Sequence, residues 1–525
     1  MSETKYAISY DIGTTGVKTC IFSIGEKIEL ISGSSSGYNL YVLDGGGAEQ
    51  DPGEWWYAMC RTTRDVLADS GVKPESISGI SFCSQMQGLV LVDKNGEPVR
   101  RAMSYMDQRA GKQLEKGMAY GLQIAGANIV KLLKSLAITG AVAASVKDPV
   151  WKYKWVEENE PDNFKRVHKW LDVKEFLICK MTGEFIMTPD SAFATMLYDI
   201  RNGRQGWSKT ICNMLGVNMA HLPEIKECTD KVGTLTEKAA SELGLAPGTA
   251  VFGGGGDASL IGVASGAVMP GETHLYWGTS GWAGTVVEKS IVDANAMIAA
   301  IVGADKGRFN YFAELETAGK CYEWAKSNIV SDRLGLYSSH ETALDAFDCM
   351  GNAADSVPAG SGGVIFAPWL HGNRCPFEDP NARGMFFNLN LETSKAQLVR
   401  AVIEGVAYHL RWFVETQDKK ITTSDTVRFA GGGAKSDVVC QILADCLGRR
   451  VEVPSQPHNA GAAGAAVVTA VGLGVVKNIE SAKPLIKIEK TFEPDMKNHE
   501  VYNKYYSAYI KLYKTNRKLF KELNS

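Results

Sequence analysis

Short apolar runs open the two halves of the chain in the same way. Residues 6–10 and 17–22 predict two strands joined by a polar turn, Asp-Ile-Gly-Thr-Thr-Gly, at residues 11–16. Residues 273–277 and 282–287 repeat this plan around a turn of Gly, Thr and Ser. The repetition of one hairpin in each half indicates an internal duplication of supersecondary structure.

Other stretches have helical spacing. Residues 394–416 place apolar side chains at positions that share one helix face, which predicts a helix buried on one side: Leu398, Val402, Ile403, Val406 and Leu410. We also expect a helix at 52–70 followed by a strand at 77–83, a largely helical region at 111–215 and a closing helix at 498–523. The alternation of strands and helices predicts an α/β protein.

Length and composition narrow the class of protein. A chain of 525 residues exceeds what one core supports, so we expect two domains with a cleft between them, and a boundary near residues 257–273. A formal charge of −3 gives no reason to expect nucleic acid or a membrane surface as a partner. Residues 460–476 are uncharged but rich in Ala and Gly, which predicts a helix packed closely on a sheet and not a membrane span.

The amino terminus and the spacing of the cysteines indicate the cellular compartment in which the protein works. No basic segment followed by an apolar stretch opens the chain, so we expect no secretory signal and a cytoplasmic location. The 11 cysteines are scattered and include no Cys-x-x-Cys, which favours reduced thiols over a disulfide framework or a zinc site.

The strongest candidate for catalysis is Asp257. An apolar lead and four glycines, residues 251–256, precede this carboxylate. Glycines let a ligand approach the backbone closely, and an acid at the end of such a run is a candidate general base. The alternative is an N-terminal cap for the helix that follows, and one residue can serve both roles.

Three glycine-containing turns are candidates for nucleotide binding. The turn at residues 11–16 offers backbone N–H groups and hydroxyls that suit phosphates, and Asp11 could hold Mg²⁺ through water. The turn at 278–280 has the same character, and the turn at 431–434 would leave a flat surface for adenine or ribose. Ordinary hairpin turns and tight strand–helix packing are the alternatives. Neither a Walker A sequence nor a protein-kinase signature is present.

Polar residues in the first half are suited to a sugar. Residues 84–88 supply carboxamides after a strand, and Asp107 and Arg109 add a carboxylate and a guanidinium. The alternative is a solvated loop with a local ion pair.

Eight blocks in this order resemble the FGGY carbohydrate kinases, and within them the xylulokinases. The blocks span residues 6–474 and lie at 11–15, 84–88, 107–109, 256–257, 278–280, 372–384, 400–405 and 431–434. The resemblance implies two actin-like, ribonuclease-H-like ATPase domains around a central cleft. It implies a sugar-side domain at 1–257, a nucleotide-side domain at 258–480 and a helical tail at 481–525.

The resemblance also implies roles for single residues. Asp257 corresponds to the catalytic base and Asp11 to the magnesium-associated aspartate. The residues that correspond to the ATP site are Gly13, Thr14, Thr15, Gly278, Thr279, Ser280, Gly432, Gly433 and Ser436. Those assigned to the sugar are Met86, Gln87, Asp107 and Arg109.

Several positions depart from the family pattern. Met86 and Gln87 stand where xylulokinases usually carry Met-His, Ala258 where many carry Asn, and Tyr105 where the family often has Trp. The stretch at 121–145 is long for its position. These departures concern the sugar side more than the phosphate side.

The expected activity is ATP- and Mg²⁺-dependent phosphorylation of a primary hydroxyl on a small ketose or polyol. Xylulose, giving xylulose 5-phosphate, is the first expectation, with ribulose, gluconate, erythritol and glycerol as alternatives. An inactive sensor that binds ATP and a sugar, and an actin-like filament or chaperone ATPase, are the rival classes. The expected partners are the sugar and ATP, and the resemblance suggests a homodimer.

Overall fold

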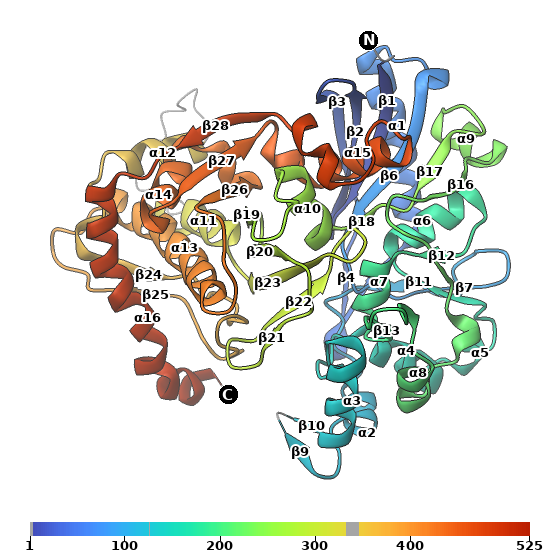
Figure 1. The fold of residues 1–525 in the computed structure, drawn as a ribbon. Helices are drawn as coiled ribbons and strands as arrows, with labels where there is room; N and C mark the ends of the chain where they lie inside the picture. Colours follow the sequence, from blue (N-terminus) through green and yellow to red (C-terminus); the bar gives the residue numbers. More distant parts are fainter. Residues whose placement is uncertain (1–3, 125, 332–345, 525) are drawn as a thin grey trace.

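Two sheets of matching layout lie at the centre of the two halves of the chain (Figure 1). The computed structural model describes residues 4–124, 126–331 and 346–524. The first sheet has seven strands in the order β16-β17-β6-β1-β2-β3, with β18 also paired to β6. Their bounds are β1 (Lys5–Ile12), β2 (Gly16–Ile24), β3 (Ile28–Gly37), β6 (Ile77–Ser84), β16 (Lys231–Thr234), β17 (Ala250–Phe252) and β18 (Gly255–Gly256).

The second sheet has eight strands in the order β21-β22-β23-β20-β19-β26-β27-β28. They are β19 (Thr273–Trp277), β20 (Gly281–Val287), β21 (Val292–Asp293), β22 (Ile298–Val302), β23 (Phe309–Leu315), β26 (Thr426–Ala430), β27 (Arg450–Pro454) and β28 (Ile488–Phe492). In each sheet the first strand pairs antiparallel with its hairpin partner and parallel with a later strand: β1 with β2 and β6, β19 with β20 and β26. The repeated hairpin predicted from the sequence is confirmed.

Short helices and minor strands fill the region between β6 and β16. The helices are α2 (Gly111–Gly117), α3 (Ile129–Thr139), α4 (Pro149–Asn159), α5 (Pro161–Phe164), α6 (Val173–Thr182), α7 (Pro189–Ala194) and α8 (Lys209–Leu215). The prediction of a largely helical region is only partly right, because β9 (Gln123–Ile124) and β10 (Ala127–Asn128) form a two-residue hairpin inside the stretch 121–145. Gly126, with φ of 77°, adopts the left-handed conformation that the turn of this hairpin requires.

The predicted long helices form where the apolar spacing places them. α1 (Pro52–Ser70) begins after Asp51, whose side chain accepts from the Gly53 amide. α13 (Lys395–Asp418) begins with a capping box of Ser394 and Gln397. The prediction that it is buried on one side is wrong: residues 399–411 are all buried, because helices and strands pack around the helix on every side. The tail forms α16 (Met496–Asn524), which packs on α13 and on α14 (Asp437–Leu447). Other elements that bear on the site are β5 (Gly47–Gln50) and α11 (Gly319–Ala325).

Two helices form a layer between the sheets. α10 (Asp257–Ser265) contacts β19 and β26 of the second sheet, whereas α15 (Ala460–Gly472) packs on α10 and on β1 and β6 of the first sheet. A Cβ at Gly464 would lie 2.4 Å from the Leu260 carbonyl oxygen, so glycine permits the close approach of the two helices. Figure 1 shows the red α15 beside the blue strands of the other half.

The close packing predicted for the Ala/Gly-rich segment is therefore present, on the sheet of the first half. The predicted range 258–480 assigns this helix to the second domain by sequence, and the domain limits stay a prediction. Among the described helices, none has the length and apolar character needed to cross a bilayer.

Candidate functional site

Strand register brings Asp11 and Asp257 to one edge of the first sheet. Asp11 on β1 lies opposite Cys83 on β6, and Cys83 lies opposite Gly255 on β18. Asp257 follows two residues later as the first residue of α10. The two carboxylates predicted to serve the base and the metal therefore lie at the same edge of the sheet, at the ends of two strands that flank β6.

The environment of Asp257 suits a proton acceptor. Burial raises the pKa of Asp257 to about 7, and the charges of Asp11 and Glu314 act in the same direction. The Ala258 amide donates to Asp257 Oδ1 at 2.8 Å and acts against that shift. A carboxyl group with a pKa near neutrality is half ionised at the working pH of most enzymes, which is the range in which general bases are effective.

The glycine run before Asp257 serves packing and not an open surface. Gly254 has φ of 68°, and a Cβ there would lie 2.4 Å from the Phe82 carbonyl oxygen. A Cβ at Gly256 would lie 2.2 Å from Met86 Sδ. The expectation that these glycines leave room for a ligand is wrong, because β6 and Met86 already fill that room. The contact does bring one predicted sugar residue, Met86, against the backbone of the predicted base.

At the tip of the first hairpin, residues 13–15, the backbone carbonyls accept hydrogen bonds from the protein, while two backbone amides have no protein acceptor in the described part of the chain. The Thr14 carbonyl accepts from Gln50 Nε2 at 2.6 Å and the Thr15 carbonyl from the Tyr38 amide at 3.0 Å. Within the described residues, no protein acceptor pairs with the amides of Thr14 and Thr15. Their N–H groups are available to an anion.

The second tip has the same construction. The Gly278 carbonyl accepts from the Gly319 amide at 2.8 Å, and the Thr279 carbonyl accepts from the Ala318 amide at 3.2 Å. In the part of the chain that the structure describes, the amides of Thr279 and Ser280 have no protein acceptor either. Two tips with carbonyls bound and amides free are what a pair of phosphate loops requires.

Tyr276 lies against two of the turns predicted to bind the nucleotide, and no pattern in the sequence indicated this position. A Cβ at Gly278 would lie 2.2 Å from the Tyr276 hydroxyl, and one at Gly431 would lie 3.0 Å from Tyr276 Cε2. Its ring stacks on Trp282 with centroids 4.0 Å apart. Burial raises the pKa of Tyr276, and Asp11 and Asp257 add to that shift. An aromatic residue in a strand predicts packing, so nothing in the sequence marks its hydroxyl.

The predicted adenosine residues differ in what surrounds them. Gly433 lies against Trp277, since a Cβ there would be 2.7 Å from Trp277 Cγ, whereas the nearest atom to a Cβ at Gly432 is 4.0 Å away. Ser436 caps α14, its Oγ accepting from the Val439 amide at 3.4 Å. Only Gly432 presents the open surface that the sequence suggested, and the role of all three stays a prediction.

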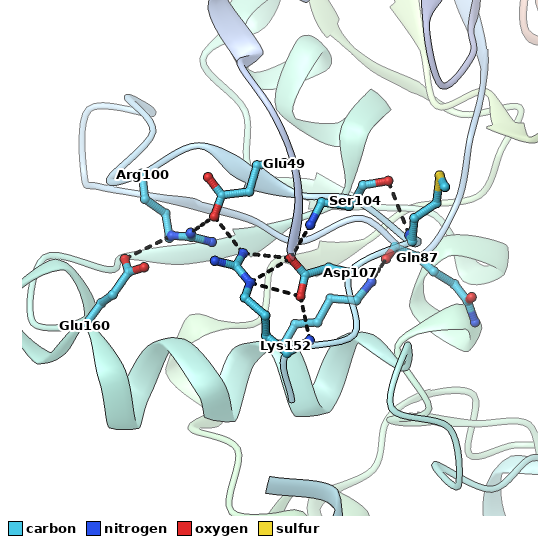
Figure 2. A network of polar contacts seen from close by, with 10 residues as sticks. Glu49, Gln87, Arg100, Ser104, Asp107, Lys152 and Glu160 are labelled. Carbon is cyan, nitrogen blue, oxygen red and sulfur yellow. Dashed lines mark hydrogen bonds and ion pairs between the residues drawn. The ribbon is translucent and has the colours of Figure 1, made fainter. Parts of the chain in front are cut away.

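Asp107 and Arg109 belong to a buried ion network, drawn in Figure 2. Asp107 is fully buried, and its Oδ2 accepts from the Ala48 amide at 2.9 Å and from Arg109 Nη2 at 2.7 Å. Arg109 also pairs with Glu49 at 2.6 Å and lies over the Trp155 ring, 4.4 Å from its centroid. The local Asp–Arg pair considered as an alternative is present. The carboxylate oxygens of Asp107 already accept hydrogen bonds from the protein, so the pair supports the loop that carries these residues.

Gln87 is held in place by the same network. Its backbone has φ of 63°, and its carbonyl accepts from Lys152 Nζ at 2.8 Å (Figure 2). Lys152 is fully buried. Burial lowers the pKa of Lys152 to about 8, against the charges of Asp107, Asp172 and Asp148. Asp172 Oδ1 accepts from the next amide, Gly88, at 2.9 Å, so the loop carrying Met86 and Gln87 is rigid.

The residues present fit a magnesium–nucleotide complex better than a protein-ligated metal. Among the described residues, no group of three or more His, Cys, Asp or Glu side chains could hold a metal ion. Mg²⁺ usually takes one or two carboxylates and completes its shell with water and phosphate oxygens. Asp11 would supply the carboxylate, and the amides of the two tips would hold the phosphate oxygens that complete the shell together with water. Gly461 of α15 lies against Asp11, since a Cβ there would be only 2.5 Å from Asp11 Oδ2.

Comparison with solved structures defines the class of protein. A gluconate kinase and a ligand-bound xylulose kinase, both from Lactobacillus acidophilus, each superpose with a TM-score of 0.84 at 24% identity, over 99% of this chain and 100% of theirs. The shared fold is the two-domain, actin-like ATPase fold of sugar kinases.

Sequence comparison then identifies the family. The model of the FGGY family of carbohydrate kinases, N-terminal domain, matches residues 6–263, and that of the C-terminal domain matches residues 275–473. The chain belongs to the FGGY family of carbohydrate kinases, phosphotransferases with a sugar acceptor.

Two named relatives of the chain illustrate the range of substrates. The chain is 29% identical to the xylulose kinase of Staphylococcus epidermidis, with 98% of each chain covered. It is 26% identical to the gluconokinase of Bacillus subtilis, over 92% of this chain and 90% of the relative. The predicted resemblance is confirmed, and the relatives carry two different substrate names.

Proposed function

We propose that this carbohydrate kinase transfers the terminal phosphoryl group of ATP to a primary hydroxyl of a small ketose or polyol, with xylulose as the first candidate. The observation that carries the proposal is Asp257, whose pKa is raised to about 7 at the same sheet edge as Asp11. A cytoplasmic location and a homodimer remain predictions.

The chain's own groups would divide the work as follows. Asp257 accepts the proton of the sugar hydroxyl as that oxygen attacks phosphorus. The free amides of Thr14, Thr15, Thr279 and Ser280 bind phosphate oxygens. Asp11 holds Mg²⁺, which neutralises phosphate charge when bound. Met86 and Gln87, on their anchored loop, orient the sugar beside Asp257.

Gluconate is the second candidate substrate. A relative named gluconokinase supports it, and Gln87, which stands where xylulokinases usually carry His, is a departure from the xylulokinase pattern on the sugar side. Neutral ketoses and polyols, namely the two xyluloses, the ribuloses, erythritol and glycerol, should be compared with gluconate in a coupled assay of ADP release.

We expect D-xylulose to give the highest kcat/KM.

Replacement Asp257→Asn should reduce turnover by about 10² to 10⁴, the usual effect of losing a general base, with ATP binding retained. Near-normal turnover in this variant would remove Asp257 from the mechanism. An absence of sugar-stimulated ADP release would favour the sensor, and sugar-independent hydrolysis or assembly would favour the filament or chaperone class.

A further inference from the structure

A buried chain of polar groups ends on the amide that precedes Asp257. Lys174 on α6 donates to Thr188 Oγ1 at 2.5 Å, and Thr188 donates to Asp190 Oδ1 at 2.5 Å. The other oxygen of Asp190, Oδ2, accepts from the Gly256 amide at 2.7 Å. Lys174, Thr188 and Asp190 are all fully buried, and the sequence analysis singled out none of them.

Asp190 uses both oxygens at once. Oδ1 accepts from Thr188 and from the Ser191 amide at 2.9 Å, while Oδ2 faces Gly256. A carboxylate accepts on both sides, whereas an amide side chain presents a donor on one of them. The buried ammonium of Lys174 pairs directly with the buried carboxylate of Glu175 and reaches Asp190 only through Thr188, so one cation serves both carboxylates.

The contact at Gly256 acts on the backbone and not on a side chain. Gly256 is the residue before α10, with φ of −74° and ψ of 162°, and no side chain caps the helix there. A Cβ at Gly255 would lie 3.1 Å from Asp190 Oδ2, so a glycine permits the approach. The peptide held by Asp190, between Gly255 and Gly256, is separated from the peptide nitrogen of Asp257 only by the Gly256 Cα and carbonyl.

α7, which carries Asp190, is itself fixed where the two halves meet. It contacts β22 of the second sheet, and Phe193 belongs to an apolar cluster that includes Ile301 and Val302. The anchor for the backbone of Asp257 therefore packs on strands of both sheets, β18 and β22.

We infer that Asp190 is a positioning residue for phosphoryl transfer. It orients the Gly255–Gly256 backbone so that the carboxylate of Asp257 faces the sugar hydroxyl. This inference rests on the proposed role of Asp257 as the base. A displacement of about 1 Å at a reacting group can reduce the rate by about 10², which sets the scale of the effect.

The test compares replacements of Asp190 with a matched control. We expect Asp190→Ala to lower kcat about 100-fold and Asp190→Asn about 10-fold, with KM for ATP unchanged. The control is Asp445→Ala on α14, because Asp445 is also a buried carboxylate that accepts a backbone amide, from Asp495 at 2.8 Å. This control should leave kcat per folded molecule unchanged.

A double-mutant cycle separates positioning from a general loss of structure. Once Asp257 is Asn, adding Asp190→Asn should lower turnover by no more than about twofold, because the group being positioned is already absent. Equal losses in both backgrounds would overturn the inference, as would wild-type kcat in Asp190→Asn. If Asp190→Ala does not fold, the Asn variant and the cycle still decide the question. Wild-type activity of Asp257→Asn alone would instead refute the proposed function.

Discussion

Gly256 offers a direct test of the contact between the catalytic loop and the sugar loop. Its backbone lies at φ of −74° and ψ of 162°, which any residue adopts, so Gly256→Ala introduces no backbone strain. The added Cβ would lie 2.2 Å from Met86 Sδ and 2.4 Å from Met86 Cγ. Ordinary contact begins at about 3.4 Å, so the two loops must separate by about 1 Å or Met86 must change rotamer.

Either adjustment disturbs the site. A shift of the loop moves Asp257, and a new rotamer moves the predicted sugar contact. We expect Gly256→Ala to lower kcat/KM for the sugar by about 10², equivalent to about 2.7 kcal/mol of transition-state stabilisation. Its unfolding free energy should fall by about 1 to 3 kcal/mol, the usual cost of overpacking. The affinity for ATP should not change.

A compensating replacement and a control complete the experiment. Met86→Ala in the Gly256→Ala background removes the clashing atoms and should restore the unfolding free energy. The value of kcat should recover because Asp257 returns to its position, whereas KM for the sugar should recover less because Met86 is absent. Gly111→Ala is the control, because a Cβ there meets nothing within 4 Å. Wild-type kcat/KM and sugar selectivity in Gly256→Ala would refute the proposed arrangement of Met86 and Asp257.

Three further predictions concern pH, metal and stability. Because Asp257 acts as a base only when ionised, a pKa of about 7 predicts that kcat/KM falls about tenfold for each pH unit below 7 and levels off above it; a flat profile between about pH 6 and 8 would contradict this. Asp11→Asn should raise the Mg²⁺ concentration for half-maximal turnover about tenfold, and an unchanged requirement would exclude Asp11 as the metal-associated residue. Glu404→Ala should lower the unfolding free energy by about 3 to 5 kcal/mol in denaturant titration, because Arg400, now 2.7 Å from Glu404, would stay buried without an opposite charge and with only two neutral acceptors, the Ala354 carbonyl and the Tyr502 hydroxyl. A loss below about 1 kcal/mol would show that Arg400 reaches solvent or another acceptor.

The elements with strong periodicity were predictable from the sequence. The hairpins around residues 11–16 and 278–280 form because alternating apolar runs flank turns rich in Gly and Thr. α13 forms where apolar residues at helical spacing follow a capping box, although its burial on all sides was not predictable from that spacing. The short strands of residues 123–128 were missed, since two-residue strands carry no period to detect.

The candidate site was predictable only where a motif carried its own chemistry. Asp11 and Asp257 stand at the ends of strands, so their proximity follows from the parallel pairing of β1 and β18 with β6. Asp190 contacts Gly256 and Tyr276 contacts Gly431, and no local pattern in the sequence records contacts between residues so far apart along the chain. The glycine run was misinterpreted because the same lack of side chains serves a ligand or a neighbouring strand.

The helix α15 has a consequence for how the chain is made. Its residues are synthesised near the end of translation, yet they cover β1 and β6, which emerge first. Until about residue 472 has left the ribosome, the face of the earliest strands has no permanent cover, and the carboxylate of Asp11 lacks the neighbouring Gly461. The first sheet therefore needs a helix from the second half to bury one of its faces. Separate expression of the first half should yield an aggregation-prone fragment instead of a working sugar-binding module.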